Sequence, residues 1–504
     1  MKIKREHVIL AIIFALTLGA RLYFAFQSEN FSQDAYFTLR YAKHIKEKLV
    51  PFYHDDLSYG GRALFRPPLF YYMLAFFNLF LPIGLVGKLL PNIFASSLVI
   101  IVYLIAKEIT KNKEASLFTA FISGFIPVFF SKTLNNISVY SFMVPLTFYT
   151  LYCLIKMNND KRYIYLFIFF LAVLRLSHAS VSLLIIALLF YLLIIKIGGL
   201  KESRAEIELI LFSTFIIVWS LFVTFKNAFL IHGPSVIWQN IPAQILTKSF
   251  SEIGILGSVY QIGVVPLVFG VYIVYKYTFK EKNKQIYLLM SFALSMFILL
   301  WLKLVKLEVG LMFLGVILVL LFSQFYKLFF LYLEKTRFFR YKKIFLVFLI
   351  LVFIFTSLIP SFSYAHKTVN GAVTDSEINA LLWLKGHSKK GDVILSTLGE
   401  GFLIPAVANR KNVADSNFLL IKDAEQRLYD IERIYSTLFE TEAIKLLNKY
   451  NVSYIYFSDR AKKEFSIEKL RYANTKCFEL VYDKDVKIYK CLCSLEEEQG
   501  NGKK

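Results

Sequence analysis

The strongest constraint on the fold of this chain is a series of apolar runs, each close to twenty residues long. A run of about 20 apolar residues lets an α-helix cross the hydrocarbon core of a bilayer, which is about 30 Å thick. The first run extends from about His7 to Phe26. Further runs lie near residues 89–106, 115–131, 139–156, 162–177, 180–197, 207–226, 258–276, 286–302, 308–326 and 343–360. They predict a polytopic α-helical membrane protein with about eleven spans.

Composition and charge agree with a membrane protein. Of the 504 residues, 57% are hydrophobic, whereas a soluble domain is about 45–50% apolar. The net charge of +22 could indicate a nucleic-acid partner. The basic residues instead gather in short loops between apolar runs, which is typical of the cytoplasmic side of a membrane protein. There is no basic stripe with interleaved aromatic residues, so we expect no nucleic-acid partner.

The charge pattern also predicts the topology of a multi-pass protein of the cell membrane. Lys2, Lys4 and Arg5 precede the first run, which places the N-terminus in the cytoplasm. The run is too long for a signal-peptide core and has no small-residue cleavage site, so it should be a retained anchor. An odd number of spans then makes the C-terminal domain extracytoplasmic. The expected parts are a transmembrane domain 1–360, an extracytoplasmic α/β domain 361–495 and a polar, disordered tail 496–504.

Four cysteines in a chain of this length do not indicate a disulfide framework. Cys153 lies in a span and should be a small core residue. Cys477, Cys491 and Cys493 lie in the outer domain, where one bridge could form in an oxidising compartment. Cys-x-Cys alone is a weak zinc signal, because structural zinc requires four ligands.

Charged and aromatic residues crowd the first outer loop, 28–88. Asp34 follows the first span, and a carboxylate there can bind a divalent cation or polarise an acceptor group. Asp55 and Asp56 could join it or be solvated. Arg62 and Arg66 could bind phosphate through their guanidinium groups. Ordinary loop charges are the alternative, but a cluster of charges at a membrane boundary favours a site.

Other basic residues near the outer ends of spans are candidates for phosphate binding. Arg175 and His178 lie at the outer end of the fifth expected span, His232 lies in the long outer loop, and Lys303 and Lys306 lie near the outer turn between the ninth and tenth spans. A lone histidine is more often a hydrogen-bonded interface residue, and lysines at helix ends often snorkel to the membrane surface. We favour Arg175 and Lys303 or Lys306 as ligands of a phosphate.

The segments SQDAYFTLRYAKHI, DDLSYGGR and RPPLFYYMLAFF resemble the GT-C class of membrane glycosyltransferases, most closely the oligosaccharyltransferase catalytic subunit of archaea and eukaryotes. The resemblance implies that Asp34 binds a catalytic divalent cation, Mn²⁺ or Mg²⁺. In the long outer loop 227–257, Ser249-Phe250-Ser251-Glu252 resembles the family motif whose glutamate reaches the acceptor amide or the metal. Glu252 would then be catalytic and a metal ligand; the alternative is a helix cap.

The outer domain resembles the same family through a helix with Trp383, a buried strand Val393–Leu395, and then Arg410 and Asp415. A later segment, EAIKLLNKYNVSYIYFS, predicts a helix followed by a strand with alternating Val, Tyr and Tyr, as in an α/β domain. Together with the apolar runs, this predicts a GT-C-type helical membrane domain followed by an extracytoplasmic α/β domain.

Two motifs depart from the family pattern. The turn that carries an acceptor-gripping Trp-Trp-Asp in the family reads Ser396-Thr397-Leu398-Gly399-Glu400-Gly401 here, without the aromatic pair and with the acid displaced. The second outer loop, 131–138, has Asn135 and Asn136 where the family usually has acids. Either Asp34 and Glu252 hold the metal alone, or the protein works without one.

The sequence therefore predicts a membrane glycosyltransferase. It would transfer a sugar or an oligosaccharide from a polyprenyl (dolichyl) phosphate or pyrophosphate to a glycan, protein or lipid acceptor on the outer face, with inversion at the anomeric carbon. One alternative is a GT-C enzyme that uses a polyprenyl-monophosphate monosaccharide to extend a glycan or lipid. Others are a non-enzymatic flippase or transporter and a catalytically dead relative.

Overall fold

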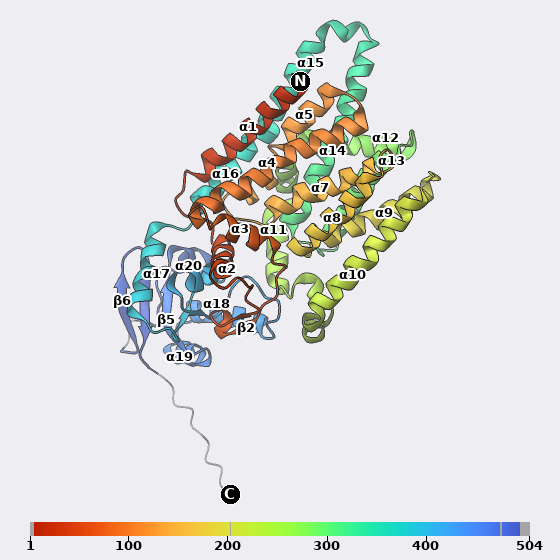
Figure 1. Cartoon of the computed structure of the whole chain (residues 1–504). Coiled ribbons are helices and arrows are strands. Elements are labelled where there is room, and N and C mark those ends of the chain that lie inside the picture. Colours follow the sequence, from red (N-terminus) through yellow and green to blue (C-terminus); the bar gives the residue numbers. More distant parts are fainter. Residues whose placement is uncertain (1–4, 202, 474–475, 494–504) are drawn as a thin grey trace. The chain divides into compact units, whose positions relative to one another are not determined.

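The computed structural model describes residues 5–201, 203–473 and 476–493, and the chain forms two compact units (Figure 1). Unit 1 comprises Met1–Glu29, Arg66–Lys226 and Ala243–Gly371. Unit 2 comprises Asn30–Phe65, Asn227–Pro242 and Ala372–Lys504. Most of the first expected outer loop thus folds with the C-terminal part of the chain, and the tail 496–504 lies outside the described residues.

Unit 1 is a helical bundle whose core is apolar. Its helices are α1 (Arg5–Ala25), α3 (Leu69–Phe77), α4 (Ile83–Thr110), α5 (Lys113–Ser123), α6 (Pro127–Lys132), α7 (Tyr140–Lys156), α8 (Arg162–Ser177), α9 (Val181–Gly198), α10 (Arg204–His232, whose last residues belong to unit 2), α11 (Ala243–Ile262), α12 (Val264–Phe279), α13 (Lys284–Trp301), α14 (Leu307–Glu334), α15 (Lys342–Phe353) and α16 (Ile359–Asn370).

Helix α14 is the central element of this bundle and packs against α4, α5, α12 and α13. The apolar stretch of α14 is 89% buried, compared with 28% for the apolar stretch of α1. Close packing of α12 on α14 requires Gly270, because a Cβ atom there would lie 3.1 Å from the Leu318 carbonyl oxygen. Small residues commonly allow such close approach between membrane helices.

The helices agree with the expected spans, although several are short. Among the described residues, seven helices are long and apolar enough to cross a membrane, or eight if the bent pair Ile253–Ile262 and Val264–Phe279 is one span. The other expected spans coincide with α5 and α6, with α7 and with α8, which have 11, 6, 17 and 16 residues. At about 1.5 Å per residue, each of these helices is shorter than the hydrocarbon core of about 30 Å.

Unit 2 is an α/β domain with a five-stranded mixed sheet in the order β4-β3-β5-β7-β6. Strands β3, β4 and β5 are parallel, whereas β7 is antiparallel to β5 and β6. The elements are α2 (Ala35–Lys48), β1 (His54–Asp55), β2 (Arg62–Ala63), α17 (Asp375–His387), β3 (Val393–Leu395), β4 (Lys411–Asn412), α18 (Ala424–Ser436), α19 (Glu440–Lys449), β5 (Val452–Phe457), α20 (Asp459–Phe465), β6 (Phe478–Asp483) and β7 (Lys487–Cys491).

Local sequence explains where these elements begin and how deeply they are buried. Helix α17 starts with a capping box, in which the Thr374 hydroxyl accepts from the Glu377 N–H and the Glu377 carboxylate accepts from the Thr374 N–H. Strand β5 coincides with the expected strand, but every residue except Ser453 is buried. The two edges of β5 pair with β3 and β7, and helices α19 and α20 pack against it.

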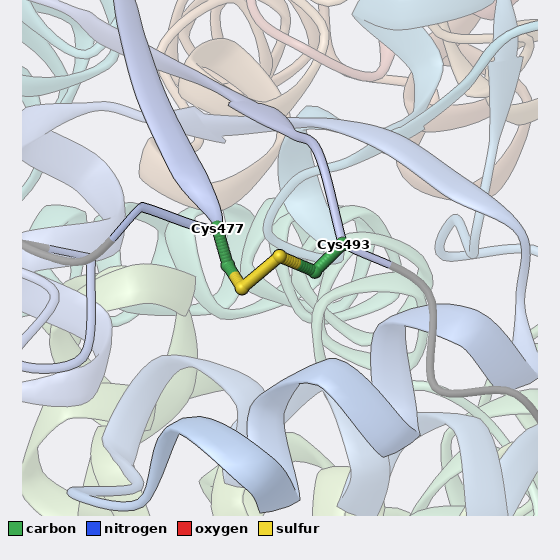
Figure 2. Close-up of a disulfide and its surroundings, with 2 residues drawn as sticks. All are labelled: Cys477 and Cys493. Atoms are coloured by element: carbon green, nitrogen blue, oxygen red, sulfur yellow. A yellow bond between two sulfur atoms is a disulfide. The ribbon is translucent and has the colours of Figure 1, made fainter.

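One disulfide joins the segments that flank the β6–β7 hairpin (Figure 2). It links Cys477 and Cys493, whose Cα atoms are 4.9 Å apart. Cys491 keeps a half-buried thiol, and burial raises its pKa to about 12. The structure thus selects one pairing among the three cysteines of this domain. Cys153 is a buried free cysteine in α7, as expected for a small core residue.

Candidate active site

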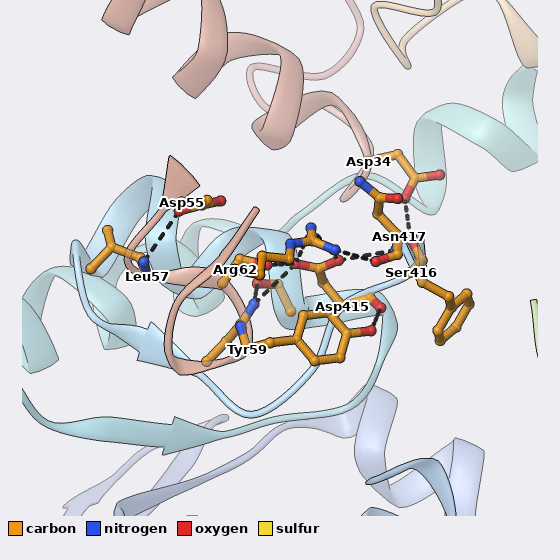
Figure 3. A network of polar contacts seen from close by, with 12 residues as sticks. Asp34, Asp55, Leu57, Tyr59, Arg62, Asp415, Ser416 and Asn417 are labelled. Carbon is orange, nitrogen blue, oxygen red and sulfur yellow. Dashed lines mark hydrogen bonds and ion pairs between the residues drawn. The ribbon is translucent and has the colours of Figure 1, made fainter. Parts of the chain in front are cut away.

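Asp34 lies at the start of α2 and keeps an exposed side chain. Helix α2 buries the residues that follow it, including Ala35, Tyr36 and Phe37. This burial fixes the helix, while Asp34, the residue that caps its N-terminus, is exposed. The Ser416 hydroxyl approaches the Asp34 carboxylate, with 3.4 Å between Oγ and Oδ1 (Figure 3). A helix N-terminus also stabilises a negative charge, so Asp34 is well placed to act as a carboxylate.

The neighbouring Asp415 is buried and accepts hydrogen bonds on both oxygens (Figure 3). The Ser58 hydroxyl donates to Oδ2 at 2.5 Å, and the Asn417 N–H donates to Oδ1 at 3.0 Å. Arg62 Nη2 lies 3.2 and 3.3 Å from the two carboxylate oxygens. The Tyr59 hydroxyl donates to the Asp415 backbone oxygen at 2.5 Å. This network holds the segment that presents Ser416.

Arg62, which was expected to bind phosphate, is buried inside unit 2. Its side chain is only 2% exposed and forms a buried ion pair with Asp415. Its guanidinium also donates to the Asn417 carbonyl oxygen and lies 4.9 Å from the centroid of the Tyr59 ring. A guanidinium with these partners has little surface left for a phosphate, so the geometry favours a structural role for Arg62.

The other two acids of this loop are also accounted for by neighbours. Asp55 is buried, pairs with Arg40 and accepts the Leu57 N–H at 3.2 Å. Asp56 is exposed and lies 3.4 Å from the His54 ring nitrogen. From sequence, Asp55 and Asp56 could either join Asp34 or be solvated. Asp56 is solvated, whereas Asp55 is buried against Arg40.

The turn after β3 points its acid into the domain. Glu400 is fully buried; its carboxylate accepts from the Thr397 N–H at 3.1 Å, from the Thr397 hydroxyl at 2.9 Å and from the Ser458 hydroxyl. Burial raises the pKa of Glu400 to about 7. Gly401 packs so closely that a Cβ atom would lie 2.1 Å from the Ala414 carbonyl oxygen. This acid is therefore not presented at the surface.

Unit 1 has its own polar cluster, where α7 begins and α8 ends. His178 Nδ1 lies 2.8 Å from the Ser180 hydroxyl, and the Tyr140 hydroxyl lies 3.2 Å from the same oxygen. Desolvation, with a further contribution from the charges of Arg66 and Lys306, lowers the pKa of His178 to about 3. Arg66 and Lys306 are the two cations whose charges act on His178, and their role as phosphate ligands stays a prediction.

The other expected phosphate ligands have partners of their own. Arg175 links α8 to α10, donating to the Ser220 hydroxyl at 2.8 Å and to the Ser220 carbonyl oxygen at 2.9 Å. Lys303 lies between α13 and α14, with its ammonium 5.7 Å from the centroid of the Phe250 ring. Glu252 belongs to α11, but its side chain lies outside the described residues, so its role stays a prediction.

A buried arginine in α1 supports the second expected outer loop. Arg21 Nε donates to the Asn92 amide oxygen at 3.0 Å, and Nη2 donates to the Thr133 hydroxyl at 2.5 Å. Sequence reasoning missed this network, although a single arginine inside the first apolar run was a visible signal. In the same loop, the Asn136 Oδ1 atom is buried without a hydrogen-bond partner among the described residues.

The donor chemistry is compatible with a hard divalent cation. Among residues 5–201, 203–473 and 476–493, no group of three or more His, Cys, Asp or Glu side chains gathers as metal ligands would. A carboxylate such as that of Asp34 is a donor type that Mg²⁺ and related cations prefer.

Comparison with known proteins defines the class of fold. The family model for dolichyl-phosphate-mannose-protein mannosyltransferases matches residues 65–231. No curated protein matches this chain in sequence. The solved structures that resemble it are membrane glycosyltransferases, and the chain therefore has the GT-C fold.

Three relatives illustrate the structural similarity. The archaeal oligosaccharyltransferase AglB from Archaeoglobus fulgidus, in complex with an inhibitory peptide and a dolichol-phosphate, has a TM-score of 0.67 and 14% identity over 90% of this chain and 69% of its own. ArnT from Cupriavidus metallidurans, bound to undecaprenyl phosphate, has a TM-score of 0.54 and 11% identity, covering 95% and 97%. The arabinofuranosyltransferase AftD from Mycobacteria has a TM-score of 0.55 and 14% identity, covering 95% and 40%.

Proposed function

We propose that this chain is a membrane glycosyltransferase that transfers a sugar or an oligosaccharide from a polyprenyl phosphate or pyrophosphate to an acceptor on the extracytoplasmic side. The single observation that carries the proposal is the exposed Asp34 carboxylate at the start of α2, with the Ser416 hydroxyl beside it. It occurs in a chain with the GT-C fold, at the position where the family resemblance puts a catalytic acid.

In this mechanism, Asp34 orients the acceptor and takes the proton of its attacking group. The nucleophile attacks the anomeric carbon, the bond from that carbon to the carrier phosphate oxygen breaks, and the phosphate leaves with the bonding electrons. A single displacement inverts the anomeric carbon. A divalent cation, if bound, would be held by Asp34 and Glu252 and would neutralise charge on phosphate.

The polar cluster of unit 1 supports a role in holding the carrier phosphate. Arg66 and Lys306 supply positive charge around a neutral His178, and Tyr140 and Ser180 supply hydroxyl groups. Guanidinium and ammonium groups are suited to phosphate. Dolichol-phosphate in the AglB complex and undecaprenyl phosphate in the ArnT complex suggest a carrier of this class.

A second candidate function follows from the inward-facing Glu400. Both of its carboxylate oxygens are used inside unit 2, so this turn offers no acid to grip an acceptor hydroxyl. That observation favours an enzyme that takes a monosaccharide from a polyprenyl monophosphate and extends a glycan or lipid. The two candidates differ in donor and acceptor but share Asp34.

The decisive experiment is a transfer assay with the purified full chain in lipid nanodiscs and a panel of polyprenyl-linked sugars. Asp34→Asn should lower transfer by about a thousandfold, because the amide cannot accept the proton. Asp56→Asn is the matched control, since Asp56 is an exposed acid of the same loop, and it should retain transfer. Full transfer by the Asp34→Asn protein would refute the proposal.

Metal dependence is tested in the same assay. The proposal expects EDTA to abolish transfer and Mn²⁺ or Mg²⁺ to restore it, and Glu252→Gln to weaken the restored activity. Calorimetric Mn²⁺ binding, lost in the Asp34→Asn protein, would identify the ligand without relying on turnover. Transfer that is unchanged in EDTA would remove the cation from the mechanism while leaving the role of Asp34 intact.

A further inference from the structure

Residues 335–343 connect two helical stretches of unit 1 that can cross the membrane. One is α14, and the other starts at Arg337 with the short helix η3 (Arg337–Tyr341) and continues into α15 (Figure 1). A short connection between two spans lies at a membrane surface. This segment contains no acid and eight charged or aromatic residues: Lys335, Arg337, Phe338, Phe339, Arg340, Tyr341, Lys342 and Lys343.

The aromatic residues of this segment are not covered by the protein. Phe338 is 59% exposed, Phe339 is 49% exposed and Tyr341 is 36% exposed. None of the residues of η3 is buried. Aromatic rings left uncovered beside a membrane span are suited to the boundary between lipid headgroups and acyl chains, where the apolar ring and a polar neighbour are both accommodated.

The positive charge of the segment is also largely unpaired. Within the part of the chain that the structure describes, only Lys342 of its five cations has an ion pair, with Glu114 and Glu334 at 3.6 Å each. Arg340 lies over the Tyr341 ring, 4.7 Å from its centroid. The other four cations are exposed, namely Lys335, Arg337, Arg340 and Lys343.

Lysines nearby on the same end of unit 1 are arranged differently. Glu6 has a side chain that is only 6% exposed, and it lies 3.2 Å from the Lys107 ammonium and 3.7 Å from the Lys113 ammonium. Glu114, the residue after Lys113, is a partner of Lys342, so these groups share one end of the bundle. The bundle thus supplies an acid to the lysines around Glu6 but leaves residues 335–343 with an excess of positive charge.

We propose that residues 335–343 bind the headgroups of anionic phospholipids in the leaflet at this end of unit 1. Exposed arginine and lysine side chains next to a span attract lipid phosphate, and guanidinium groups bind phosphate through two donors. A phospholipid presents its negative charge directly above apolar chains, which matches cations interleaved with exposed phenylalanines. An acidic protein would match the charge alone. The proposal does not depend on glycosyl transfer.

Lipid binding can be measured on the detergent-purified full chain by native mass spectrometry. The protein is titrated with phosphatidylglycerol and, separately, with phosphatidylcholine of the same acyl chains. The wild type should have a Kd for phosphatidylglycerol about tenfold lower than for phosphatidylcholine, the size expected from one or two basic contacts at a membrane surface. The preference should weaken at high ammonium acetate concentration, because salt screens exposed charges.

Two variants separate charge from a change in fold. The triple variant Arg337→Gln, Arg340→Gln and Lys343→Gln should reduce the preference for phosphatidylglycerol to within about twofold, because most of the exposed charge is gone. The double variant Arg337→Lys and Arg340→Lys keeps the charge and should keep the preference.

The matched control removes three exposed cations from unit 2 instead. Lys385→Gln, Lys389→Gln and Lys390→Gln lower the net charge of the chain by the same amount. This control should bind both lipids as the wild type does. Loss of the preference in the control would show that net charge, and not residues 335–343, attracts the lipid.

Other outcomes would also overturn the assignment. Equal affinity of the wild type for the two lipids would refute it, and so would a preference that survives in the triple glutamine variant or is lost in the double lysine variant. Displacement of phosphatidylglycerol by glycerol phosphate would indicate a site for a soluble anion. Tight binding of polyglutamate without a lipid preference would assign the surface to an acidic protein.

Discussion

Asp34 and Asp415 are neighbouring acids of unit 2 with opposite environments. Asp415 is 1% exposed and accepts from Ser58, Arg62 and Asn417. Asp34 is exposed at the start of α2. A buried acid must be fully paired, because desolvated charge is costly without partners. The comparison teaches that Asp415 holds the loop through buried partners, whereas Asp34 keeps an exposed carboxylate.

Breaking the Asp415 pair should have the largest effect on stability. Arg62→Met leaves a buried, uncompensated carboxylate, and removing one partner of a buried pair costs about 3–5 kcal/mol. We expect this loss in the free energy of opening of unit 2, measured by pulsed labelling of the Cys491 thiol, which is half-buried in the native domain. Labelling at the wild-type rate would show that the pair does not hold this domain together.

The next largest effect on the stability of unit 2 comes from Glu400, and this effect depends on pH. Its folded pKa of about 7 lies above the ordinary value of 4.5, so the folded domain binds the proton more tightly than the unfolded chain. Unit 2 should lose stability as pH rises from about 4.5 through 7, by about 3 kcal/mol in total. Glu400→Gln should flatten this dependence in the same labelling experiment, and a wild-type profile without slope would contradict it.

Ser58→Ala should have a smaller effect, because it removes one hydrogen bond to Asp415 but leaves the ion pair with Arg62. We expect a loss of about 1–2 kcal/mol, the range for a hydrogen bond to a charged group. Ser416→Ala is the useful comparison, since its hydroxyl contacts an exposed acid and should matter less for stability. A larger cost for Ser416→Ala would reverse the assignment of the two acids.

Asp34→Asn should have the smallest effect on stability, within about 0.5 kcal/mol of the wild type, as is usual for surface substitutions. The same substitution should have the largest effect on transfer. Measuring stability and transfer on one preparation of the Asp34→Asn protein distinguishes the role of Asp34 from that of Asp415. A marked loss of stability in this variant would mean that Asp34, like Asp415, serves the fold.

Sequence patterns were most reliable where a single physical rule dominates. The apolar runs predicted the helices of unit 1, and the strand Val393–Leu395 was predicted with its observed bounds. Sequence patterns were less reliable for the roles of charged side chains. Arg62 was predicted to bind phosphate, yet it folds onto Asp415, which is 353 positions away in sequence. No local pattern reveals a partner at that separation.

The sequence by itself determined that this chain forms membrane-spanning helices and an α/β domain, because hydrophobic length and periodicity act within one segment. Only the tertiary structure decided which charged side chains are buried against partners and which stay exposed. It buried Asp55, Arg62, Glu400 and Asp415 against partners and left Asp34 exposed. The reason is that burial and pairing depend on distant segments meeting, as Ser58 and Asp415 do across 357 positions.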